Sequence, residues 1–448
     1  MTCVVVIAIG GLDILPVLTL GLHGIWLPDP ATWNVQVTSA MESLIWVPHH
    51  VTAMIASFVG FMALSTPSEG KALRRAVFAG ACFASALGLS VWVTLAAMTT
   101  AGCWLLSLVI ARRWKPAGGL LIAGGVAIIL AGVQIWDLHA GRAAAGLPIA
   151  FTVRGFSPLD LVLPPGPLNL AGRLICLPVN YFVEFGVLAS GALLLWEDRR
   201  KFLLPDTEFK RVLVIAAVCG LTLGAFLKST LYNNDLGWRV MLFPIFAGIV
   251  CTVAALERRF STIAAPSYNL LMKQIPALIW VVSFIGSGTT LYALINNRAY
   301  AAFNMPQNLQ FTASEPVAQH DLRGAYIWAN THLQQTFVLQ HNPAPTRVFP
   351  FGLYSRNRVA IADAQAGLYG AAEAAVAARE RALTPVFTQA MSPAAVRARA
   401  QANGVDALVI DSDDPVWRTP TSWVWTSKTL YSAGRVRIIA SSAVGSPP

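Results

Sequence analysis

The sequence has few charged residues. Only 12% of its 448 positions are Asp, Glu, Lys or Arg, whereas soluble globular domains carry about a quarter. Up to Ile295 these charges lie in short loops between long apolar runs. A membrane-spanning helix needs about 20 mostly apolar residues, and several runs reach that length. The sequence therefore predicts a multi-pass protein of the inner (plasma) membrane, with the lipid bilayer as its first partner.

The common catalytic and metal-binding motifs are also missing. The sequence contains no P-loop, no G-x-S-x-G, no G-x-G-x-x-G dinucleotide fingerprint and no C-x-x-C. Its six cysteines all precede residue 295 and show neither ligand-like spacing nor a disulfide framework. No residue is therefore assigned as a metal ligand. The net charge of +10 does not indicate nucleic acid, because the positive charges fall in loops between apolar runs.

The apolar runs predict a mostly α-helical architecture, a membrane bundle of about seven full spans. A further run, 76–109, is too long for one span and too short for two full ones, and it carries Gly, Ser and Thr near its middle. We interpret it as a short helical hairpin that enters and leaves on one side. The predicted full spans are 3–22, 51–64, 120–136, 178–196, 212–232, 240–256 and 275–295.

Positive charge predicts the orientation of the bundle, since loops rich in Lys and Arg stay in the cytoplasm. Basic residues crowd the loops near 71–75, 112–115, 199–211 and 258–273, and they are sparse in the loops 23–50, 137–177 and 233–239. The sparse loops, and everything after Ile295, should therefore face outward.

Residues 297–448 have a different composition and predict a separate extracytoplasmic α/β domain, following a membrane domain of residues 1–296. Helical patterns cover 321–334, 371–383 and 393–402, and Asp321 is a plausible N-cap. Short strands are predicted at 347–351, 358–362, 407–411 and 435–440. Alternating strands and helices are typical of a layered α/β fold.

Asp235 and Arg239 are an acidic and a basic residue in the short loop between two apolar runs, at the predicted outer ends of two membrane spans. Ionisable residues there are costly unless they pair or contact a ligand. Asp235 could hold a divalent metal or orient a phosphate, and Arg239 suits bidentate phosphate contact. Lys228, about two turns earlier in the preceding run, could join them. The alternative is an interfacial ion pair, with Lys228 reaching the headgroups.

His49 and His50 open the second span on its outer side, where imidazoles could serve as base or ligand. Helix neighbours point about 100° apart, so the alternative is that they only cap the helix. Glu184 shares a helix face with Asn180 four residues earlier. It could be a base, a metal ligand or a partner for Arg173.

Asp13 lies inside the first apolar run. If that run spans the membrane, Asp13 is buried and needs a partner. If the helix ends near Gly11, Asp13 is at the surface.

Taken together, these stretches resemble the later part of bacterial membrane glycosyltransferases of the GT-C superfamily. The likeness covers most of the chain, although each motif is weak by itself. The resembling stretches include Gly11–Leu12–Asp13, Trp46–Val47–Pro48–His49–His50, the run 76–109, Asn234–Asp235–Leu236–Gly237–Trp238–Arg239 and, in the later domain, Gly404–Val405–Asp406 and Asp413–Asp414–Pro415.

The resemblance implies transfer of a sugar from a polyprenyl-phosphate carrier on the extracytoplasmic face. An acid in the first outward loop of such enzymes acts as base or holds a metal, and basic residues contact the lipid phosphate. That first-loop acid belongs to helices that precede the resembling stretch, so Asp13 or Glu42 would have to replace it. The remaining candidates are Glu184 and Asp235 as acids, with Lys228, Arg239, His49 and His50 for the phosphate.

Two other functions remain open from the sequence. A transporter or flippase would explain Glu184 and Lys228 inside spans, although no internal repeat is evident. A non-catalytic, shortened relative would explain the missing early helices.

Overall fold

The structure is a computed structural model that divides the chain into two compact units. The helical unit comprises Met1–Ile135 and Pro148–Leu294, and the C-terminal unit comprises Trp136–Leu147 and Ile295–Pro448. The residues that the structure describes are 6–7, 10–22, 24, 33–35, 37–66, 70–142, 148–189, 208–230, 235–261, 280–288, 319–344, 351–362 and 373–447.

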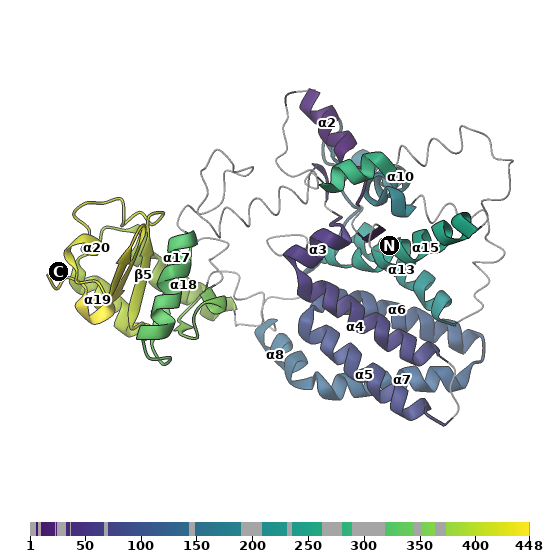
Figure 1. The fold of residues 1–448 in the computed structure, drawn as a ribbon, viewed down its shortest axis with the longest axis horizontal. Helices are drawn as coiled ribbons and strands as arrows, with labels where there is room; N and C mark the ends of the chain where they lie inside the picture. Colours follow the sequence, from purple (N-terminus) through teal and green to yellow (C-terminus); the bar gives the residue numbers. More distant parts are fainter. Residues whose placement is uncertain are drawn as a thin grey trace. The chain divides into compact units, whose positions relative to one another are not determined.

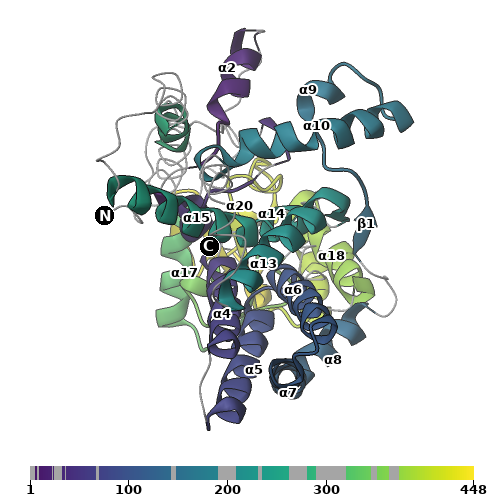
Figure 2. The same ribbon diagram turned by 90° about the vertical axis from the view of Figure 1, so that its right-hand side faces the viewer.

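The helical unit is built from α-helices and one short antiparallel ribbon, in which β1 (Ile149–Phe151) pairs with β2 (Leu227–Ser229). Helices α4 to α7 lie side by side, and α13 packs against α4 and α6 (Figures 1 and 2). The helices of this unit are α2 (Ile14–Leu22), α3 (Ala40–Trp46), α4 (Pro48–Ser65), α5 (Ala72–Leu89), α6 (Val91–Ile110), α7 (Trp114–Leu130), α9 (Ser157–Asp160), α10 (Pro167–Phe185), α13 (Glu208–Phe226), α14 (Asp235–Arg239) and α15 (Leu242–Ser261). Helix α8 (Gly132–Arg142) begins in this unit, and its residues from Trp136 onward belong to the C-terminal unit.

Aromatic side chains fill the centre of this bundle. Phe58 on α4 has its ring centroid 5.1 Å from that of Phe243 and 4.3 Å from that of Phe246, both on α15. Trp104 on α6 is fully buried. Gly80 on α5 allows a close approach to α7, because an added Cβ would lie 2.6 Å from the carbonyl oxygen of Ala123. Small residues at such crossings are typical of membrane bundles.

The described residues contain four helices long and apolar enough to cross a membrane, or up to six when each of two bent pairs counts as one span. Large apolar side chains on these helices are exposed, among them Met98, Ile128 and Ile129, as lipid-facing residues would be. A helical membrane bundle is therefore supported, but with fewer spans than the seven that the sequence predicts. Parts of the runs 178–196 and 275–295 lie outside the described residues.

The run 76–109 does form two helices, as predicted, but the prediction that they are short is wrong. Helix α5 has 18 residues and α6 has 20, or about 27 and 30 Å at 1.5 Å per residue. That is close to the thickness of the hydrocarbon core, about 30 Å. The prediction counted the apolar residues alone. It left out the start of α5, which carries Arg74 and Arg75. It also allowed too many residues for the connection between the helices, which is the single residue Ser90.

Two other predicted spans are interrupted. In the first run, residues 10–13 are not helical before α2 begins at Ile14. The second interruption is in 178–196. Helix α10 already begins at Pro167, carries Pro178 in its interior and ends at Gly186, whose φ of 48° lies in the left-handed region. Glycine adopts that region without steric penalty.

The C-terminal unit is a three-layer α/β fold. Its five strands lie in the order β4-β3-β5-β7-β6, with β4, β3 and β5 parallel and β7 and β6 antiparallel. Helix α17 (Gln319–His332) packs on one sheet face, while α18 (Glu373–Thr388), α19 (Pro393–Ala402) and α20 (Trp423–Thr426) pack on the other. The strands are β3 (Val338–Gln340), β4 (Arg358–Val359), β5 (Ala407–Asp411), β6 (Tyr431–Ala433) and β7 (Val436–Ala440), with 3₁₀ turns at Phe351–Leu353 and Ser441–Ala443.

Several predictions for this unit match the structure, notably β5 and α19, and the fold is α/β. The strand predicted at 347–351 is wrong at Phe351, which begins a 3₁₀ turn, and its other residues lie outside the described part. Strands β3 and β6 were missed. Asp321 is not the N-cap, since α17 begins at Gln319. Its carboxylate instead accepts a hydrogen bond from the backbone amide of Arg435 at 2.9 Å.

Candidate functional site

The first polar cluster of the helical unit surrounds Arg239, and we call it the cation cluster. Helix α14 places Asp235 and Arg239 one turn apart, with a nitrogen–oxygen distance of 3.2 Å. The guanidinium carbon of Arg239 lies 5.0 Å from the ring centroid of Trp46 and 5.6 Å from that of Trp238. The Arg239 side chain is only 4% exposed. The ion-pair alternative is thus the arrangement in the structure, with two tryptophans added.

His49 and His50 complete the cation cluster at the start of α4. Their ring centroids are 4.0 Å apart. Both imidazoles are close enough to Arg239 for its positive charge to disfavour their protonation. His50 Nδ1 is 2.7 Å from the hydroxyl of Ser90, which also caps α6 by accepting from the amide of Val93. His49 is exposed. The alternative, in which both histidines cap the helix and meet lipid headgroups, is not the arrangement of His50, whose ring bonds to Ser90 of the next helix, and the N-cap residue of α4 is Val47.

The second polar cluster, the acid cluster, gathers Asp13, Glu184 and Asn34. Asn34 Nδ2 donates to Glu184 Oε1 at 3.0 Å and to Asn180 Oδ1 at 2.9 Å. The shared helix face of Asn180 and Glu184 is therefore confirmed. Trp33 Nε1 donates to Asp13 Oδ1 at 3.0 Å. Asp13 is half-buried and lies within electrostatic range of Glu184.

The short helix α3 connects the two clusters. Glu42 lies in its first turn, is buried, and is within electrostatic range of Asp13. Its amide donates to the hydroxyl of Ser39, the N-cap, which is the Ser-x-x-Glu pattern of a capping box. Trp46 of the cation cluster follows four residues later, about 6 Å along the helix. Glu42 thus has a structural role at the helix start as well as a place beside Asp13.

Arg154 is the residue that the sequence did not indicate. It lies in the segment after β1, is 2% exposed, and donates to the backbone oxygens of Val35 and, at 3.4 Å, Gly237. It therefore contacts the segments that carry both clusters. Burial lowers the pKa of the guanidinium, and the nearby Glu184 opposes that shift. The signal in the sequence was that Arg154 is one of few basic residues in the Lys- and Arg-poor loops.

A tight backbone contact fixes Asp13 against α10. The amide of Leu12 donates to the carbonyl of Val183 at 2.6 Å. A Cβ added to Gly11 would lie 2.3 Å from the carbonyl oxygen of Glu184, a distance that no side chain tolerates. Two alternatives are predicted for Asp13, a buried position within a span and a surface position after a helix break. The helix does break near Gly11, but Asp13 is held against α10 rather than left at the surface.

Two predicted partnerships are not found. Lys228 does not lie on a helix leading to Asp235, because α13 ends at Phe226 and Lys228 is exposed on strand β2, opposite Ala150. Arg173 pairs with Asp160 at 2.8 Å rather than with Glu184.

The chemistry available at these clusters is acid–base and electrostatic. Asp13, Glu42 and Glu184 lie on one side with the Arg154 guanidinium nearby, and Arg239, its partner Asp235 and two imidazoles lie on the other. Among the described residues, no group of three or more His, Cys, Asp or Glu side chains is arranged to hold a metal ion. The arrangement can accept a proton at a carboxylate and attract an anion near Arg239.

The C-terminal unit has its own buried polar residues at the ends of its parallel strands. Asp414 accepts from Asn342 Nδ2 at 2.8 Å and from the amide of Asp411, and burial followed by the charge of Asp411 raises its pKa. His341 bonds to the hydroxyl of Tyr326 at 2.8 Å and to the carbonyl of Ala362 at 2.9 Å. Burial lowers the pKa of His341 to about 4, so this imidazole is neutral in the fold.

Comparison with known proteins gives one informative likeness. The chain is similar to the uncharacterized protein y4nK of Sinorhizobium fredii (strain NBRC 101917 / NGR234), with 26% identity over 230 residues. The match covers 47% of this chain and 31% of that protein, so the chain spans about a third of the relative's length. No protein-family model matches the chain.

Proposed function

We propose that the chain is a membrane glycosyltransferase of GT-C type that takes a sugar from a polyprenyl-phosphate carrier. The observation that carries the proposal is that helix α3 bears a residue of each cluster, Glu42 of the acid cluster and Trp46 of the cation cluster, one turn apart. Sugar transfer from a lipid phosphate needs these two kinds of group close together. The loop charges favour placing both clusters, and the C-terminal unit, on the extracytoplasmic side.

The cation cluster would receive the carrier phosphate. His49 is its exposed side chain, and Arg239 lies behind it within electrostatic range. A charge in a site of low dielectric constant attracts an anion more strongly than it would in water. Trp46 and Trp238, which flank Arg239, offer flat faces on which a sugar ring can stack. The leaving phosphate gains negative charge as the bond breaks, and a fixed cation stabilises it.

The acid cluster would activate the acceptor. In the proposed step a hydroxyl of the acceptor attacks the anomeric carbon of the sugar, and the bond from that carbon to the phosphate oxygen breaks. The electron pair leaves with the polyprenyl phosphate. Asp13, held by Trp33, takes the hydroxyl proton as general base. Glu184 and Arg154 hold the segment that carries Trp33, since Glu184 accepts from Asn34 and Arg154 donates to the carbonyl of Val35.

The test uses the purified full chain with labelled undecaprenyl-phosphate glucose as the donor probe. We expect Arg239→Gln to weaken carrier binding about tenfold, since a charge-assisted contact contributes about 1.5–3 kcal/mol. Asp13→Asn should abolish transfer while carrier binding remains. Arg173→Gln is the matched control, because Arg173 pairs with Asp160 outside both clusters. If no sugar is transferred and Arg239→Gln binds the carrier as the parent does, the proposal fails.

A transporter is the second candidate, favoured by one observation. Arg154 is almost fully buried in the helical unit, within electrostatic range of the buried Glu184. Buried charges in membrane bundles often mark an ion or substrate path. Uptake into proteoliposomes that requires an ion gradient and is lost in Glu184→Gln would favour this candidate over sugar transfer.

A further inference from the structure

The end of the bundle at which α5 and α7 begin carries two kinds of basic residue. Some have a partner within the fold, since Arg75 donates to the carbonyl of Thr66, and Arg113 and Arg211 both pair with Glu208. Four others are exposed, and among the described residues no acidic side chain pairs with them. We call these four residues the basic patch: Lys71, Arg74, Arg112 and Lys115. Like charges without counter-charges repel one another and attract an anion from outside the chain.

Helix packing brings the two halves of the basic patch to one level. A Cβ added to Gly80 on α5 would lie 2.6 Å from the carbonyl oxygen of Ala123 on α7, and these residues are the ninth and tenth of their helices. Further along, Gln134 Nε2 donates to the carbonyl of Leu87 at 3.2 Å, so α5 and α7 run in the same direction. At 1.5 Å per residue the two helices therefore begin within about 2 Å of the same level.

Arg112 has a backbone conformation that glycine would adopt more easily. Among the described residues it is the one non-glycine residue with a positive φ, 54°. Its amide donates to the carbonyl of Val109 at 2.9 Å, and the amide of Arg113 donates to that of Leu108 at 2.8 Å. This is a Schellman motif, in which glycine usually occupies the left-handed position. The turn therefore does not explain the arginine, and strained positions of this kind concentrate at functional sites.

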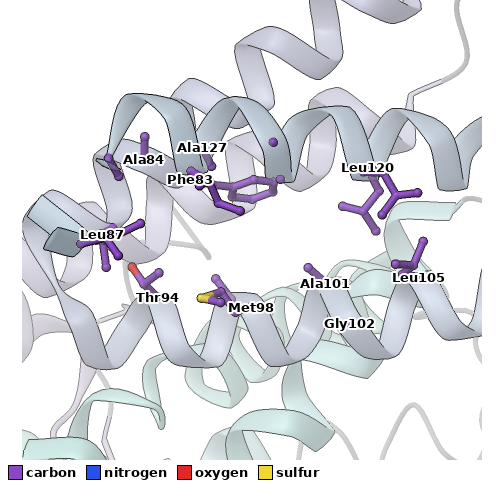
Figure 3. A pocket seen from close by; sticks show the side chains of 17 residues that line it. Phe83, Ala84, Leu87, Thr94, Met98, Ala101, Gly102, Leu105, Leu120 and Ala127 are labelled. Atoms are coloured by element: carbon purple, nitrogen blue, oxygen red, sulfur yellow. The ribbon is translucent and has the colours of Figure 1, made fainter. Parts of the chain in front are cut away.

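Two large apolar side chains accompany the basic patch. Leu73 and Trp114 are each 64% exposed, and tryptophan is enriched where a membrane meets water. Figure 3 shows Leu105 and Leu120 among the side chains that line an apolar pocket further along α5, α6 and α7. Leu120 lies about 9 Å from the start of α7, so the helices become apolar within two turns. The basic patch is therefore at the level of the lipid headgroups.

We propose that the basic patch binds the headgroup of an anionic phospholipid in the leaflet that meets this end of the bundle. The lipid phosphate lies between the start of α5 and the turn from α6 to α7, and Leu73 and Trp114 contact the adjoining acyl carbons. Clusters of Lys and Arg directly beside membrane helices attract anionic lipids, and the two apolar side chains favour a lipid over a soluble anion. The patch is at the opposite end of α6 from Ser90 and the cation cluster, so it does not depend on sugar transfer.

The experiment uses the full chain, purified and stripped of lipid, and native mass spectrometry to compare dioleoyl phosphatidylglycerol with dioleoyl phosphatidylcholine. The parent should bind the anionic lipid at least tenfold more tightly. Arg74→Gln and Lys115→Gln should each weaken phosphatidylglycerol binding about fivefold, through loss of one charge near the phosphate. Lys428→Gln is the matched control, because it removes an exposed charge from the C-terminal unit, and it should bind like the parent.

Arg112→Gly separates lipid binding from folding. Glycine accepts the positive φ without strain, so this variant should melt at the temperature of the parent or above it, while its phosphatidylglycerol binding falls about fivefold. A lower melting temperature with unchanged lipid binding would mean that Arg112 serves the turn, and would overturn its place in the site.

Size-exclusion chromatography confirms that each variant is folded, as expected for substitutions at exposed positions. Equal binding of the two lipids by the parent would overturn the proposal, as would unchanged phosphatidylglycerol binding by both Arg74→Gln and Lys115→Gln. A second arm adds free glycerol phosphate, which should not displace the lipid. If it does displace phosphatidylglycerol, and is itself lost from Arg74→Gln and Lys115→Gln, the patch binds a soluble phosphate and the phospholipid proposal is wrong.

Discussion

Arg154 and Glu184 should stabilise the helical unit as a coupled pair. Arg154 is 2% exposed and Glu184 is 3% exposed, and their charges interact through space, so removing either charge weakens that interaction. Residues coupled in one network show interaction energies of about 0.5–3 kcal/mol. One kcal/mol corresponds to about 2–4 °C of melting temperature in a domain of this size class. Arg154→Gln and Glu184→Gln should therefore each lower the melting temperature by about 1–12 °C.

The assay is thermal unfolding of the purified full chain in detergent, followed by tryptophan fluorescence. The double variant should lose much less than the sum of the single variants, because removing both charges leaves neither unpaired. Arg173→Gln is the control. Its ion pair with Asp160 is partly exposed, and such pairs contribute about 0–1 kcal/mol. Additive losses in the double variant, or a loss in Arg173→Gln equal to that in Arg154→Gln, would refute the pairing.

Three other variants test single contacts. Burial lowers the folded pKa of His341 from 6.5 to about 4, so its stabilisation is complete above pH 6.5 and disappears as the pH falls toward 4. The parent should therefore lose about 3 kcal/mol of unfolding free energy in acid that His341→Gln does not lose. The melting temperatures of the two proteins should accordingly converge as the pH falls. Gly11→Ala, whose Cβ meets a backbone carbonyl of α10, should abolish the monodisperse peak in size-exclusion chromatography, whereas Gly118→Ala should retain it. Ser90→Ala removes the cap of α6 and should lower thermal stability by about 1 kcal/mol; an equal effect of Ser85→Ala, which lies outside any cap, would contradict this.

The parts of the fold that could be predicted are those that a local pattern determines. Strand β5 is a continuous apolar run, and α19 begins at Pro393 after a Ser cap and ends before Gly404, whose φ is 66°. The short strands β3 and β6 have three residues each and are held by their neighbours in the sheet, so no local pattern indicates them.

The site could be predicted only in part, for a similar reason. Asp235 with Arg239, and Asn180 with Glu184, are neighbours on one helix, and spacing alone brings them together. Arg154 and Asn34 enter through contacts between segments far apart in the sequence. Lys228 was assigned to a helix because the apolar run continues past Phe226, but the chain turns there into the ribbon with β1.

The distance in sequence between Asn34 and Glu184 has a consequence for biosynthesis. The two residues are 150 positions apart, and ribosomes add about 5–20 residues per second. Asn34 must therefore wait roughly 8–30 s for its acceptor to be made, while the helices between them are already being inserted. Nascent chains arrested before α10 should accordingly lack the contacts that Asn180 and Glu184 give to Asn34.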